Sequence, residues 1–234
     1  MNHLSIICCF NNKNKLKKYL LASPDIDRHE IILIEDPDSL PKGYNTAITR
    51  AKNSLILCVH QDVIFPHDFF TRLFHDLKNI EEQCGKAWGV IGAAGVAKDQ
   101  TSLGYLYDCC RPLKNGHIFP SEVRVLDELF LFFQKDVLHF DENIPSKHHF
   151  HGVDICLLAS KVGLMNFVTG AYCLHMSQHK NKRKVDQDYI DAYNYMRKKW
   201  WNFLPIHTTT TVITNNEHPK QFHGVDCLCT GNHE

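Results

Sequence analysis

Several features are scarce in this sequence of 234 residues, and each absence excludes a class of protein. No apolar run approaches the roughly 20 residues that a helix needs to cross a membrane. Neither sign of charge is in excess, since Lys+Arg and Asp+Glu both number 26, so no basic surplus indicates nucleic-acid binding. The apolar start of the chain has no basic segment before it, unlike a signal peptide. We therefore expect neither a transmembrane segment nor a nucleic-acid partner.

Cysteine, by contrast, is abundant, with 10 residues. Several fall inside expected strands, among them Cys8, Cys58 and Cys173, where a cysteine behaves as a small buried hydrophobe. In a chain without a secretion signal, reduced thiols are a simpler interpretation than a disulfide framework. We therefore expect a cytoplasmic protein.

The order of the apolar segments predicts an α/β fold. Buried strands are expected at residues 4–10, 30–34, 54–59, 88–93, 129–133 and 167–174. Helices are expected near residue 16 and at 43–52, 69–77, 152–159 and 186–203. Glycines and prolines break residues 99–123 into loops, and a loosely attached polar tail follows Pro205. This alternation implies a mixed, mostly parallel sheet flanked by helices.

Acidic residues gather at the expected strand ends. Glu35 and Asp36 follow the second strand, Asp62 follows the third, and Asp127 precedes the strand at residue 129. Ligands of open α/β sheets bind outside the carboxyl ends of the strands. Carboxylates hold Mg²⁺ or Mn²⁺ together with phosphate oxygens. The pattern therefore favours a nucleotide diphosphate bound with a divalent cation.

The segment at residues 44–48 and the triplet His60, Gln61 and Asp62 resemble the donor half of family 2 glycosyltransferases, which have the GT-A fold. In that family an Asn-containing helix precedes a strand that ends in a DXD motif. His60 stands here at the first acid of that motif, and Asp62 matches the last, metal-binding acid. The resemblance implies nucleotide contacts at these residues: Cys9, Asn11, Glu35, Asp36, Asn45, His60, Gln61 and Asp127.

Later segments are similar to the acceptor half of the same family. They lie at residues 125–128, 131–133, 140–142 and 150–157, and His175 resembles the late histidine that completes the metal site. The match runs from about residue 5 to 177. It implies one GT-A domain at residues 1–205 and a tail at 206–234. Within the domain we expect a donor half to about 99, an acceptor half to about 181 and a C-terminal helix at about 185–203.

The resemblance also implies an activity. A sugar would pass, with inversion, from a nucleotide diphosphate donor to an acceptor hydroxyl, with Mn²⁺ or Mg²⁺ as cofactor. UDP-sugars and a surface-glycan or lipid-linked acceptor are favoured by analogy with the family. Peripheral association with a membrane is compatible with such an acceptor.

The expected catalytic base departs from the family pattern. The family's Glu-Asp pair falls by position on His151 and Gly152. Asp154 is the nearest acid and our predicted base, because an inverting transfer needs a proton acceptor for the attacking hydroxyl. His151 is the competing candidate.

Other interpretations stay open. Asp62 could cap the following helix, Glu35 and Asp36 could be turn residues, and Asp154 could favour a helix dipole. A structural zinc site could form in a scaffold protein from tail residues, namely His223, Cys227, Cys229 and His233. The missing Glu-Asp pair is also compatible with a GT-A homologue that has lost activity.

Overall fold

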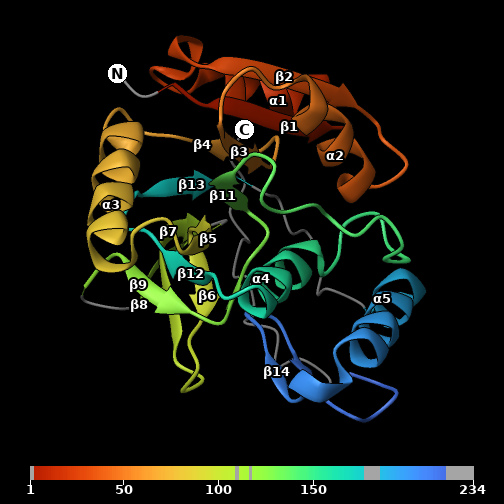
Figure 1. The fold of residues 1–234 in the computed structure, drawn as a ribbon. Coiled ribbons are helices and arrows are strands. Elements are labelled where there is room, and N and C mark those ends of the chain that lie inside the picture. The colour runs from red at the N-terminus through yellow and green to blue at the C-terminus, as the bar shows by residue number, and fades with distance from the viewer. Residues whose placement is uncertain (1–2, 109–110, 116–117, 177–184, 220–234) are drawn as a thin grey trace.

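The computed structural model describes residues 3–108, 111–115, 118–176 and 185–219 (Figure 1). The strands are β1 (Ser5–Phe10), β2 (Glu30–Glu35), β3 (Leu55–Val59), β4 (Val63–Ile64), β5 (Trp88–Gly92), β6 (Ala94–Val96), β7 (Ser102–Asp108), β8 (Arg111–Asn115), β9 (Ser121–Val123), β10 (Val125–Leu126), β11 (Phe130–Gln134), β12 (Met165–Val168), β13 (Cys173–His175), β14 (Ile206–His207) and β15 (Val212–Ile213). The helices are α1 (Lys13–Lys18), α2 (Leu40–Arg50), α3 (Phe69–Cys84), α4 (His151–Lys161) and α5 (Gln187–Lys199), with short 3₁₀ turns η1 (Leu20–Ala22), η2 (Ile26–Arg28) and η3 (Trp201–Phe203).

A seven-stranded sheet in the order β2-β1-β3-β11-β5-β12-β9 forms the centre of the fold. β1 pairs in parallel with β2 and β3, and β12 pairs in parallel with β5. β11 runs antiparallel to both β3 and β5, and β9 runs antiparallel to β12. The mixed, mostly parallel sheet expected from the sequence is therefore present.

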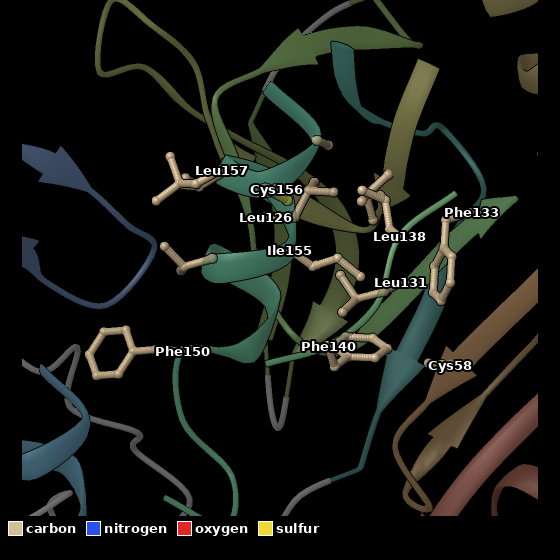
Figure 2. Close-up of a cluster of buried hydrophobic side chains, with 14 of the residues drawn as sticks. Cys58, Leu126, Leu131, Phe133, Leu138, Phe140, Phe150, Ile155, Cys156 and Leu157 are labelled. Carbon is tan, nitrogen blue, oxygen red and sulfur yellow. The ribbon is translucent and has the colours of Figure 1, made fainter. Parts of the chain in front are cut away.

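Alternating side chains along the strands build apolar layers on both faces of this sheet. In β1, Ile7 belongs to the buried apolar cluster that includes residues of α2, α4 and α5, whereas Ile6 belongs to the cluster that includes residues of α1 and α3. β11 repeats the pattern, and Figure 2 shows its Leu131 and Phe133 beside Ile155 of α4. The strands are continuous apolar runs in the sequence because helices cover both faces of the sheet.

A second sheet, in the order β10-β6-β7-β13-β4 with β8 beside β7, corrects two expectations. Residues 99–123 are not all loop, because β7 pairs with β6, β8 and β13. Gly104, read as a breaker, instead makes room for Leu113, whose Cδ2 lies 2.9 Å from the position of an added Cβ. The single strand expected at 167–174 is two, β12 and β13, which belong to different sheets.

Helix and tail boundaries also differ from expectation. α2 begins at Leu40, with Ser39 as its N-cap, and α5 ends at Lys199 rather than at residue 203. After Pro205, β14 and β15 form a hairpin whose Ile206 and Ile213 are fully buried. The loose attachment expected from residue 206 therefore does not apply to this hairpin. Among the described residues, no helix has the length and apolar composition needed to cross a membrane.

Candidate functional site

The carboxyl ends of β1, β2 and β3 lie at one edge of the main sheet because these strands are parallel. β11 runs in the opposite direction, so the residues that precede it reach the same edge. The His60 N–H donates to the Leu129 carbonyl at 3.1 Å, which places Asp127 and Glu128 beside the loop that follows β3. This edge collects most of the polar side chains singled out in the sequence.

His60, Asp62 and His175 bring their ligand atoms within 4.8 Å of one another. His175 Nε2 lies 3.6 Å from Asp62 Oδ1, although the two residues are far apart in the sequence. They meet because β13 pairs antiparallel with β4, and His175 stands opposite Val63 in that pairing. The sequence-predicted metal residues Asp62 and His175 therefore lie together, and His60 joins them.

Asp108 orients the imidazole of His175. His175 Nδ1 lies 2.8 Å from Asp108 Oδ1, and the two residues are direct neighbours in the β7–β13 pairing. This contact turns Nε2 toward Asp62. Carboxylate–histidine pairs of this kind fix the orientation of histidines that bind metals. Sequence reasoning missed Asp108 because it falls in the segment that was expected to be loop.

The electrostatics of the cluster follow from burial and mutual charge. Burial and then the charge of His175 lower the pKa of His60 to about 4. Burial would also lower the pKa of His175, but its bonds to Asp108 and Asp62 raise it to about 9. Burial opposes ionisation of Asp62, yet hydrogen bonding and the charge of His175 hold the pKa of that carboxyl below its usual value. His60 and Asp62 are therefore in the neutral and ionised forms that bind metal ions, whereas a metal bound by His175 Nε2 would have to displace a proton.

These residues fit a divalent cation. His60 Nε2 is buried and makes no hydrogen bond to any described residue. Two imidazole nitrogens and a carboxylate form a ligand set for a divalent transition metal, and the carboxylate is the type of ligand that Mn²⁺ and Mg²⁺ prefer. A further group of described residues, His149, Asp186 and Asp188, has the same spacing, but Asp186 Oδ1 already caps α5 by accepting the Tyr189 N–H at 2.9 Å.

Gln61 and Asn11 bind each other. Gln61 Oε1 accepts the backbone N–H groups of Asn11 and Asn12 at 3.2 and 2.9 Å, and its amide donates to Asn11 Oδ1 at 2.7 Å. This reciprocal pair ties the loop after β1 to the loop that carries Asp62. The structure therefore gives both residues a positioning role at the edge of the site.

Glu35 and Asp36 are exposed at the end of β2, at the same edge. Glu35 Oε1 lies 2.9 Å from Lys13 Nζ, and the side chain is 57% exposed. Asp36 has φ 42°, in the left-handed region, and its N–H donates to the Phe10 carbonyl at 2.8 Å. Both carboxylates face solvent beside the end of β1.

Cys9, Asn45 and Asp127 are engaged with the protein. Cys9 is 6% exposed, and its Sγ lies 2.5 Å from the position of a Cβ on Gly43, so only glycine lets α2 pack there. The Asn45 amide donates to the Phe140 carbonyl at 2.9 Å and to Glu142 Oε1 at 2.8 Å. Asp127 accepts from the Leu129 N–H and from Thr209 Oγ1. Their side chains hold the walls of the site together, which gives no support to the expected nucleotide contacts.

The two base candidates on α4 are buried and in contact with other parts of the protein. Asp154 is 1% exposed, and its Oδ1 accepts from Trp200 Nε1 and lies 2.7 Å from Lys199 Nζ. His151 is 1% exposed and packs its ring against Tyr44. The geometry thus assigns Asp154 to anchoring α5 and leaves His151 in the core, which argues against both as the base. The tail residues of the zinc alternative lie outside the described part of the chain.

Comparison with known proteins decides the family. The sequence profile described as "Glycosyltransferase like family" matches residues 5–200. The chain belongs to the glycosyltransferase-like family. No curated protein sequence matches it.

Solved structures with the GT-A fold resemble this family member. TarS from S. aureus (residues 1–349, in complex with UDP-GlcNAc) shares 11% identity and a TM-score of 0.53, with 85% of this chain and 66% of that chain covered. The mannosyltransferase PcManGT from Pyrobaculum calidifontis, in complex with GDP-Man and Mn²⁺, shares 10% identity and a TM-score of 0.54, with 86% and 64% covered. This chain therefore spans just under two thirds of the length of both, and the likeness establishes the GT-A fold.

Glu128 is a site-edge residue of this glycosyltransferase-like chain that sequence reasoning did not single out. Its Oε1 accepts the Gly152 N–H at 3.2 Å, and the N–H groups of His151 and Phe150 also point at the carboxyl. It thereby caps α4, whose N-cap residue Phe150 offers no side-chain acceptor. The only sequence signal was its place next to Asp127.

Proposed function

We propose that this chain is a glycosyltransferase that moves a sugar from a nucleotide diphosphate donor to an acceptor hydroxyl, with a divalent cation at the cluster of His60, Asp62 and His175. The carrying observation is that this cluster lies where β3 and β13 end, at the ligand-binding edge of the sheet, in a chain of this family. A bound divalent cation would neutralise the negative charge that develops on the departing diphosphate.

Several residues of the chain would bind the cation and the donor or hold the site in position. Asp62 and the two histidines would hold the cation, and Asp108 would keep His175 in position. Lys15, whose Nζ lies 3.9 Å from Asp62 Oδ2, adds positive charge beside the expected place of the diphosphate. The exposed carboxylates of Glu35 and Asp36 are available to the ribose and base. The Gln61–Asn11 pair would hold the two loops at the spacing that the donor requires.

The finer assignments extend this proposal. The solved structures most informative about the donor contain UDP-GlcNAc and GDP-Man, so a UDP- or GDP-linked sugar is the proposed donor class. Mn²⁺ is the proposed metal, with Mg²⁺ as the alternative, because PcManGT was solved with Mn²⁺. We further propose that the transfer inverts the anomeric centre and that the acceptor is a glycan or a lipid-linked saccharide. The proposed location is the cytoplasm. Within the domain, the donor half and the acceptor half are divided as expected from the sequence.

Calorimetry tests the donor site directly. UDP-GlcNAc and GDP-mannose are titrated into wild-type protein, Asp62→Asn and the exposed Asp136→Asn, each with and without Mn²⁺. Asp136 follows the opposite end of β11, which makes it a matched carboxylate control. We expect Mn²⁺-dependent binding by wild type and by Asp136→Asn, and its loss in Asp62→Asn. Binding that is equal in all variants and independent of Mn²⁺ would refute the proposal.

Turnover distinguishes an active enzyme from an inactive homologue. Release of free nucleotide from the same donors, with water as the acceptor, is followed in the presence of Mn²⁺. We expect release by wild type that Asp62→Asn lacks. Donor binding without any release, in water or with added glycan acceptors, would instead favour a homologue that binds donors but has lost catalysis.

A further inference from the structure

The first helical turn of α4 has a carboxylate beside it that comes from another part of the chain. Gly152 lies where the sequence comparison expected an acidic side chain, and a Cβ added there would meet Glu128 Cγ at 2.7 Å. The next neighbours of that position, Glu128 Cα and the Leu126 carbonyl, are 3.4 and 3.5 Å away. Glu128 therefore occupies the space that a side chain at position 152 would fill.

The backbone that carries this carboxylate adjoins the loop of the proposed metal cluster. Phe130 pairs with Val59 at the end of β3, and the His60 N–H bonds the Leu129 carbonyl. Glu128 immediately precedes that contact and so borders the loop that contains Asp62. Its side chain remains 19% exposed, whereas Asp154 is 1% exposed.

Four of the other described acids at this edge have partners, and a fifth, Asp36, is exposed to solvent at the end of β2. Asp62 and Asp108 face His175, Glu35 faces Lys13, and Asp127 accepts two hydrogen bonds. Among the described residues, the Glu128 carboxyl meets backbone N–H groups and the His151 ring, whose Nδ1 lies 3.4 Å from Oε1. Burial lowers the pKa of His151 well below its usual value, so this ring is neutral and does not neutralise the carboxylate.

We propose that Glu128 is the catalytic base of the transfer, supplying from the segment before β11 the carboxylate that α4 lacks at Gly152. This inference rests on the proposed function. In the step, the Glu128 carboxylate takes the proton of the acceptor hydroxyl while that oxygen forms a bond to the anomeric carbon. The bond from the anomeric carbon to the diphosphate oxygen breaks, and its electron pair leaves with the nucleotide diphosphate.

The surroundings of Glu128 suit a proton acceptor. Burial and then the charge of Asp127 raise its pKa to about 8, while the N–H groups at the start of α4 favour the carboxylate. The other titratable groups that face it are the His151 imidazole, the Tyr44 and Tyr189 phenols and the Cys156 thiol. Burial raises the pKa of both phenols and of the thiol, so these groups are neutral near pH 7. A base whose pKa lies near the working pH is the most effective one.

The test compares Glu128→Gln with wild type and with the exposed control Glu82→Gln on α3. Donor affinity, the unfolding midpoint and the rate of nucleotide release from UDP-GlcNAc and GDP-mannose with Mn²⁺ are measured across pH. We expect Glu128→Gln to keep donor affinity and fold but to lose about 10²- to 10⁴-fold in turnover. Wild-type turnover should rise with pH, with a limb at or below about pH 8 that the variant lacks. Turnover of Glu128→Gln within threefold of wild type would overturn the assignment.

A double variant separates catalysis from capping. Glu128→Ala removes the atoms that crowd position 152, so Glu128→Ala/Gly152→Asp moves the carboxylate onto α4. We expect the turnover of this double variant to be at least tenfold higher than that of Glu128→Ala. No recovery, or a loss in Glu128→Gln that is matched by lost donor affinity or a lower unfolding midpoint, would show that Glu128 only caps the helix. If wild type neither binds nor cleaves either donor, the proposed function itself fails; if wild type does both, only the role of Glu128 is in question.

Discussion

Replacing Asp154 with alanine should destabilise the protein through the contact between α4 and α5. The carboxylate is 1% exposed and accepts the Trp200 Nε1–H at 2.7 Å. It also lies 2.7 Å from Lys199 Nζ, which keeps a second partner, Asp141, at 2.6 Å. The substitution therefore leaves the indole N–H without its acceptor, while the lysine retains one carboxylate.

The size of the effect follows from these contacts. A buried donor without a partner costs about 1–3 kcal/mol, and a hydrogen bond to a charged group contributes about 1.5–3 kcal/mol. Burial raises the pKa of Asp154 even though Lys199 and Trp200 favour the carboxylate, so part of that gain offsets desolvation. We expect a loss of about 3 kcal/mol in the free energy of unfolding. For a domain of this size, that corresponds to a decrease of roughly 6–12 °C in Tm.

Chemical and thermal denaturation of Asp154→Ala, Asp154→Asn and the exposed control Asp136→Asn measure the effect. Asp154→Asn keeps an oxygen for Trp200 and should lose about half as much stability, whereas the control should change by less than about 0.5 kcal/mol. Turnover per folded molecule of Asp154→Asn should stay within a few fold of wild type. A loss of 10²-fold or more in turnover, with stability unchanged, would make Asp154 the base and refute this account.

Further predictions concern the site and its neighbours. Asp108→Asn should weaken Mn²⁺ affinity in the presence of UDP by about 10- to 100-fold, because His175 loses the group that orients it, and a Mn²⁺ titration measures this. Gln61→Ala should lower donor affinity about tenfold by freeing the loop after β1; an unchanged Kd would contradict the positioning role. The pKa of Glu128 is raised from an ordinary value of about 4.5 to about 8, so the contribution of Glu128 to stability is lost as the pH rises through that interval. The unfolding free energy of Glu128→Gln relative to wild type should therefore increase by a few kcal/mol between pH 4 and 9, and a constant difference would contradict the assigned pKa.

The main sheet and one side of the site could be predicted because their signals are local. The apolar runs of β1 and β3 are nearly unbroken, and the polar residues that follow them, Asn11 and Asp62 among them, mark the strand ends. The strands β7 and β8 could not be predicted in this way, since the pairing of β7 with β13 involves distant parts of the chain. Gly104 shows the difficulty, because it is a breaker in the sequence but a close-packing position in the β7–β8 pair.

Sequence reasoning missed or misassigned those site residues whose role depends on a contact with a residue far away in the sequence. Asp108 meets His175 across 67 positions, and Glu128 meets Gly152 across 24. Asp154 is an acid in the first turn of a helix, as a base would be, but its partner Trp200 lies 46 positions later. The spacing of residues in the sequence does not predict such long-range contacts. These contacts determine whether a carboxylate is buried in a structural role or is accessible to a substrate.

A structure of the protein with Mn²⁺ and UDP, in which anomalous scattering locates the metal, tests the central claim most directly. One Mn²⁺ is expected, bound by Asp62, His60 and His175, with oxygens of the diphosphate completing its coordination. A metal bound instead by His149, Asp186 and Asp188, or UDP bound at the sheet edge with no metal near Asp62, would contradict it.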